Sequence, residues 1–140
     1  ADRQGVPDWL EKFAKEHPVK TVSVVRRYEE ARDAIANGYP VPVCSNAGFS
    51  STRDSEGFAR PEGNWAHCMC FIAVDDVSSR KGLLCHNSWG PDWISGPKTH
   101  NQPEGSFWVD ANVCTKMLQE GDSYAISQFE GIDDKTSIIF

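Results

Sequence analysis

The sequence has no long apolar run and no basic region. Its longest apolar stretch, from Cys68 to Val74, has the length of a buried strand and falls far short of the roughly 18 residues that cross a bilayer. The net charge is -6, and the lysines and arginines are scattered, so no basic field is present to attract nucleic acid. We therefore expect a soluble protein with neither a nucleic-acid nor a membrane partner.

The chain also lacks a recognisable start and an even number of cysteines. Residues 1–9 (ADRQGVPDW) contain neither an initiating Met nor the apolar core of a signal peptide, so we expect the natural start to have been removed or to lie upstream. Five cysteines leave at least one unpaired within the chain. The cysteine pattern does not identify a cellular compartment.

What is present is the composition of one globular domain, with 39% hydrophobic and 24% charged residues. Asp8 and Glu11 have the spacing of a capping box, and apolar residues at helical spacing predict a helix over 8–17. A second helix is predicted over 28–37, because acidic residues begin it and Gly38 can adopt the left-handed conformation that ends it.

The remaining segments predict strands joined by polar loops. The segment 39–49 (YPVPVCSNAGF) reads as a strand whose two prolines place it at an edge or mouth of a sheet, and 50–63 reads as a loop. We expect a hairpin of 67–76 and 82–89, a long loop over 91–105, strands at 106–110 and 124–129, and a short helix capped by Asp110. With no internal repeat, the fold class is α+β: a small antiparallel sheet flanked by short helices.

One motif in this arrangement is specific. Asn87-Ser88-Trp89-Gly90 is followed by Trp93 and by the strand 105–109 (GSFWV), and His67 opens an apolar strand twenty residues before Asn87. This pattern resembles the C-terminal, His- and Asn-bearing half of the papain-like (C1) cysteine peptidases. The resemblance covers residues 28–129, although the loop 91–104 is longer than is usual in that family.

The resemblance implies a fold, a domain division and a set of roles. The fold would be a papain-like half, a half-barrel of antiparallel strands, in residues 28–140, with residues 1–27 forming an N-terminal helix and extended linker. His67 would be the general acid/base, and Asn87 would orient it through an amide carbonyl that accepts from the imidazole without adding charge. Trp89 would cover this pair, and Trp93 and Cys44 would line the substrate pocket.

The family's nucleophilic cysteine, which lies on a helix after a glutamine, has no counterpart here, since the only cysteine before His67 is Cys44. The resemblance therefore implies a polypeptide substrate and a nucleophile supplied by a preceding Cys-bearing segment or another chain. We expect this chain alone to have negligible peptidase activity. The family is often secreted or lysosomal.

Two other hypotheses remain open. The chain could be a non-catalytic binding or structural module that kept the fold and the His–Asn pair. A weaker alternative is an amidase of the NlpC/P60 type using Cys44, whose Cys-Ser pair the sequence resembles at Cys44-Ser45, although the interval to His67 is short.

A metal site is the sharpest competing interpretation of the residues around His67. His67, Cys68, Cys70, Cys85 and His86 are of zinc-ligand types. On a strand, however, Cys68 and Cys70 share one face while His67 points to the other, and no Cys-x-x-Cys motif is present. We expect no metal and no cofactor, and instead buried free thiols or a disulfide from Cys68 or Cys70 to Cys85. His86 should point away from the His67–Asn87 pair.

Overall fold

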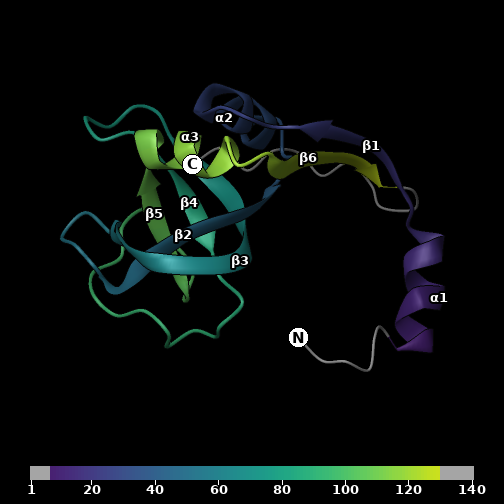
Figure 1. Cartoon of the computed structure of the whole chain (residues 1–140), viewed down its shortest axis with the longest axis horizontal. Helices are drawn as coiled ribbons and strands as arrows, with labels where there is room; N and C mark the ends of the chain where they lie inside the picture. Colours follow the sequence, from purple (N-terminus) through teal and green to yellow (C-terminus); the bar gives the residue numbers. More distant parts are fainter. Residues whose placement is uncertain (1–6, 130–140) are drawn as a thin grey trace.

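The structure is a computed structural model that describes residues 7–129. This part of the chain folds as α+β: a six-stranded, open antiparallel sheet with strand order β1-β6-β2-β3-β4-β5 and three helices (Figure 1). The strands are β1 (Val19–Val24), β2 (Val41–Arg53), β3 (Ala59–Asp75), β4 (Gly82–His86), β5 (Ser106–Asp110) and β6 (Asp122–Phe129), and the helices are α1 (Asp8–Glu16), α2 (Tyr28–Ala36) and α3 (Ala111–Leu118).

The main core lies between the sheet and the pair α2 and α3. Helix α2 begins with Glu29 and Glu30 in its first turn, where the helix dipole favours acidic groups, and ends before Gly38, whose φ is 85°. It buries Ala31 completely, and α3 buries Met117 and its neighbours against the same face of the sheet. Burial of these apolar side chains is the main force that holds the helices in place.

Strands β4 and β5 are covered on both faces. Leu83 and Phe107 face the main core, whereas their chain neighbours Leu84 and Trp108 form a second cluster with Phe58. Such two-sided burial explains why these strands read as continuous apolar runs rather than as alternating ones. The two strands therefore form a rigid base at the end of which Asn87 is placed.

Helix α1 stands apart from this body. It has no buried residue, and Figure 1 shows it beyond the ribbon formed by β1 and β6. The apolar side chains Trp9, Leu10 and Phe13 are exposed, at 71%, 39% and 57%. Among the described residues, no helix combines the length and the apolar character needed to cross a membrane.

Most predicted elements are confirmed with small shifts at their ends. The helix over 28–37, the strands 106–110 and 124–129 and the long loop after Gly90 are present. The hairpin is also confirmed, because β3 and β4 pair antiparallel with Cys70 opposite His86. The outer ends of the predicted segments 1–27 and 28–140 lie outside the described residues.

Segment 39–49 was predicted to lie at an edge or at the mouth of a sheet. The edge position is wrong, because β2 lies inside the sheet between β6 and β3. The prolines are tolerated there for a local reason. Strand β6 pairs with β2 only at Val43 and Cys44, so Pro40 and Pro42 lie outside the stretch that is paired on both sides.

The predicted loop over 50–63 is likewise wrong, since β2 continues to Arg53 and β3 starts at Ala59. The pairing of these long strands contains several register shifts, and polar residues are accommodated on the exposed parts of the bulged ribbon. Only a short turn remains, in which the Asp54 carboxylate accepts hydrogen bonds from the backbone N–H groups of Glu56 and Phe58.

Two predicted helix caps are also wrong. Pro7, with φ of -60°, precedes α1, so Asp8 is already the first helical residue and its side chain caps nothing. Asp110 does precede α3, but its carboxylate binds the Arg80 guanidinium instead of the helix N-terminus.

Candidate active site

The side chain of His67, inside β3, meets the side chain of Asn87, the first residue after β4. The imidazole Nε2 lies 2.9 Å from Asn87 Oδ1, so the predicted contact is confirmed. Because an amide oxygen can only accept, Nε2 carries the proton in this arrangement. The same oxygen accepts from the backbone N–H of Ser88 at 2.7 Å, which fixes the amide in place. Asn87 is 3% exposed, and His67 is half-buried.

Trp89 covers the imidazole, as predicted. Its ring stacks on His67 with a centroid separation of 4.8 Å and an angle of 25°. One side of the His67–Asn87 hydrogen bond is thereby placed beside an apolar ring, where reduced contact with water strengthens a polar interaction. Trp89 itself is 48% exposed, so its outer surface faces solvent.

Trp93 supports this cover from the loop after Gly90. Its ring contacts Trp89 edge-on at 5.6 Å and also packs on the core residue Phe107. The indole N–H donates to the backbone carbonyl of Gly105 at 2.7 Å, which fixes the loop after Gly90. Trp65 completes the aromatic cluster through its contact with Trp89. Trp93 therefore contacts the site through Trp89, and its predicted role in lining the substrate cleft stays a prediction.

The second nitrogen of the imidazole is open. Within residues 7–129, no group forms a hydrogen bond with His67 Nδ1. An imidazole held through Nε2 and open at Nδ1 can accept a proton at Nδ1 and later return it. The arrangement therefore has the geometry of a general acid/base.

A pocket of about 380 Å³ adjoins His67. Cys44 and Cys68 form part of its wall, and the role of Cys44 in a substrate pocket stays a prediction. Two carboxylates, Glu120 and Asp122, also line it, and Glu120 is fixed by hydrogen bonds from the backbone and side-chain amides of Asn46. Its remaining lining residues are Ser45, Asn46 and Ala66.

A disulfide joins Cys44 to Cys68. Cys44 cannot act as a nucleophile while it is bonded in this way, which removes the basis for the amidase alternative in this form of the molecule. A disulfide from Cys68 or Cys70 to Cys85 was one of the alternatives considered from the sequence. Neither bond is present, since Cys70 and Cys85 are both free thiols.

The free thiols are poorly placed to serve His67. Cys85 and Cys114 are buried, and burial raises the pKa of both thiols. Burial also raises the pKa of Cys70, which lies three residues from His67 along the strand, or about 10 Å at the usual rise. Among the described residues, His67 therefore has no free thiol as a partner.

The other histidines lie away from this pair. His86 is exposed, and its Nε2 lies 3.2 Å from the carbonyl oxygen of Glu104, which confirms that it points away. His100 is also largely exposed, and its Nε2 lies 3.4 Å from an Asp75 carboxylate oxygen. Within the part of the chain that the structure describes, no three histidine, cysteine or acidic side chains are arranged to hold a metal ion.

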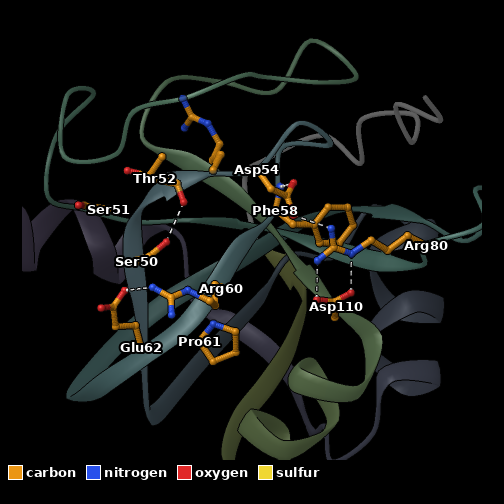
Figure 2. A pocket seen from close by; sticks show the side chains of 11 residues that line it. Ser50, Ser51, Thr52, Asp54, Phe58, Arg60, Pro61, Glu62, Arg80 and Asp110 are labelled. Carbon is orange, nitrogen blue, oxygen red and sulfur yellow. Dashed lines mark hydrogen bonds and ion pairs between the residues drawn. The ribbon is translucent and has the colours of Figure 1, made fainter.

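A larger pocket, of about 600 Å³, lies along the β2–β3 hairpin (Figure 2). Its cationic groups are already occupied. Arg80 lies over the Phe58 ring and binds both oxygens of Asp110. At the other end of the pocket Arg60 pairs with Glu62. The third arginine of the lining, Arg53, donates to the backbone carbonyls of Gly96, Pro97 and Ser106. All three arginines are therefore engaged within the chain, and we assign this pocket no function.

Three features of the site region were not predicted from the sequence. The Cys44–Cys68 pair depends on strand register, and the two acidic residues of the pocket come from the turn and strand that follow α3. The register that sets Cys44 opposite Cys68 also sets Ser45 opposite His67, and only a correct pairing of β2 with β3 could have revealed it.

No protein-family model matches this chain, and no curated protein matches it significantly.

Proposed function

We propose that this chain is the His- and Asn-bearing half of a papain-like cysteine peptidase. The observation that carries the proposal is the imidazole of His67, held through Nε2 by Asn87 at 2.9 Å, stacked beneath Trp89 and open at Nδ1. The open sheet with helices on one face is compatible with a papain-like half-barrel. The substrate would be a polypeptide, and no cofactor is required by this chemistry.

The proposed mechanism uses a thiol that reaches Nδ1 from outside the described residues, on a preceding segment or on another chain. His67 accepts the thiol proton at Nδ1, and the thiolate attacks the peptide carbonyl. The imidazolium then donates that proton to the nitrogen of the leaving amine. Asn87 keeps the second ring proton on Nε2 throughout, so that the ring remains in one orientation.

A second function is favoured by the lack of a free thiol beside His67 among the described residues. In this alternative the chain is a non-catalytic binding or structural module, and the His67–Asn87 pair stabilises the loop that carries Trp89. The hydrolysis experiment described next distinguishes this module from a peptidase.

The test is hydrolysis of a peptide amide by the longest polypeptide that the gene encodes, compared with the 140-residue chain alone. We expect turnover by the longer polypeptide that is blocked by a thiol-directed inactivator, and none by the chain alone. His67→Ala should reduce kcat at least a hundredfold, whereas the matched variant His86→Ala should leave it within about twofold.

Lack of turnover by the longer polypeptide, or full activity of His67→Ala, would favour the non-catalytic module. Turnover by the chain alone that disappears in Cys44→Ala would instead make Cys44 the nucleophile.

A further inference from the structure

The disulfide between β2 and β3 lies one residue pair from His67. Cys44 and Cys68 are opposite one another in the strand pairing, and the next pair is Ser45 opposite His67. Immediately beyond this pair the register shifts, and Ala47 pairs with Asn64. The disulfide therefore fastens the last regular part of the ladder, one residue pair from His67.

On its other side, this part of β3 has little support. Strand β4 pairs with β3 only from Cys70 onward, where Cys70 lies opposite His86. At His67 the contact toward β4 is the side-chain hydrogen bond to Asn87. The position of the His67 backbone thus depends mainly on β2, and the disulfide is the strongest connection to β2.

The disulfide is accessible to solvent, unlike the thiols of Cys85 and Cys114. Cys68 is exposed, Cys44 is half-buried, and both line the pocket beside His67. The thiols of Cys85 and Cys114 are buried. A small thiol reagent can therefore reach this bond without unfolding the core.

We propose that the Cys44–Cys68 disulfide is a redox switch that controls the alignment of His67 with Asn87. The proposal concerns regulation of the same site and rests on the proposed function only for the catalytic consequence of that alignment. In the oxidised form the imidazole is held where it is observed. In the reduced form the strand segment around His67 loosens, and the imidazole loses its fixed orientation.

The switch requires a dithiol as reductant. One thiolate of the dithiol attacks the exposed Cys68 sulfur, which breaks the Cys44–Cys68 bond and releases the Cys44 thiolate. The second thiolate of the reductant then attacks the reductant's first sulfur, which is bonded to Cys68 in the mixed disulfide. This breaks the mixed disulfide and releases the Cys68 thiolate. The reductant is oxidised to a cyclic disulfide, two electrons pass to the protein sulfurs, and two protons convert them to thiols.

The test is backbone hydrogen exchange and imidazole ¹⁵N NMR on the full 140-residue chain, with and without dithiothreitol. We expect reduction to speed amide exchange in residues 64–68 at least tenfold, with less than a twofold change in 83–85 and 107–109. The Nε2–H signal of His67 should be sharp in the oxidised chain and exchange-broadened in the reduced one. Cys44→Ala/Cys68→Ala should behave as the reduced chain without any reductant.

Two matched variants separate a local switch from general destabilisation. Cys70→Ala keeps the disulfide and should respond to dithiothreitol as the wild-type chain does. Cys114→Ala removes a buried core thiol remote from His67 and should not broaden the His67 signal in the oxidised form. Equal acceleration of exchange throughout the sheet, or an unchanged His67 signal on reduction, would overturn the switch. Both readouts are independent of turnover, so they stand apart from the test of peptidase activity.

Discussion

At the scale of single residues, Arg53 is the most unusual side chain outside the site. It is 5% exposed, and burial lowers its pKa. Its guanidinium donates to the backbone carbonyls of Gly96, Pro97 and Ser106, so it connects β2 to the long loop and to β5 without a carboxylate partner. A charge satisfied only by carbonyl dipoles depends on every one of them.

We expect Arg53→Met to destabilise the chain by about 3 kcal/mol, because it leaves buried carbonyls without donors. The measurement is urea unfolding followed by circular dichroism. Arg60→Met is the matched control, since the Arg60 side chain is 74% exposed and its surface pair with Glu62 contributes little. Equal effects of the two variants would contradict the structural role assigned to Arg53.

At the scale of elements, the turn between β3 and β4 is organised by the buried carboxylate of Asp75. Burial acts to raise its pKa, but hydrogen bonds from the Ser78 side chain and from the backbone of Ser78 and Val77, together with the nearby His100, hold the pKa below the usual value. A depressed carboxyl pKa stabilises the folded state above the unfolded-state value, and this contribution is lost as the pH falls through the folded-state value.

We therefore expect Asp75→Asn to reduce stability at pH 7 and to have a smaller effect at about pH 3, below the ordinary carboxyl pKa of about 4. Urea unfolding of wild type and variant at both pH values measures this difference. Asp92→Asn, at an exposed loop position, serves as the control for removal of one negative charge. A loss of stability in Asp75→Asn that is the same at both pH values would show that the carboxylate charge is unimportant.

The elements also show which parts of the structure the sequence could predict. His67 and Asn87 were placed together because two strongly apolar strands with a polar turn have one natural pairing, which sets both residues at the same end. The position of β2 was mispredicted, because Pro42 indicates an edge and its tolerance depends on how far β6 extends. The disulfide at Cys44 depends on the pairing of β2 with β3, so it could not be predicted either.

At the scale of the whole molecule, exposed apolar side chains are concentrated at the N-terminal side. Within residues 7–129, six of the nine large exposed hydrophobic residues lie in α1 and β1, at Trp9, Leu10, Phe13, Val19, Val22 and Val24. The main core does not depend on α1, since α1 has no buried residue. Stability and this exposed apolar surface should therefore be separable.

We expect Leu10→Gln/Phe13→Gln to change the free energy of unfolding by less than about 0.5 kcal/mol, because both side chains are exposed and glutamine is compatible with a helix. Val25 is 3% exposed and lies at the end of the same N-terminal segment. Val25→Ala should lower the free energy of unfolding by about 2 kcal/mol, because it leaves a cavity. Thermal unfolding measures both. A comparable loss in the glutamine variant would mean that α1 packs on the body in solution.

The stacking of Trp89 on His67 gives the molecule an optical signal of its own. The indole of Trp89 is half exposed, lies against the imidazole and contacts Trp65 and Trp93. Its excited state is sensitive both to surrounding water and to the charge of the adjacent ring. In a chain whose other four tryptophans are replaced by phenylalanine, the fluorescence of Trp89 would report whether the His67 face is wet, covered or charged.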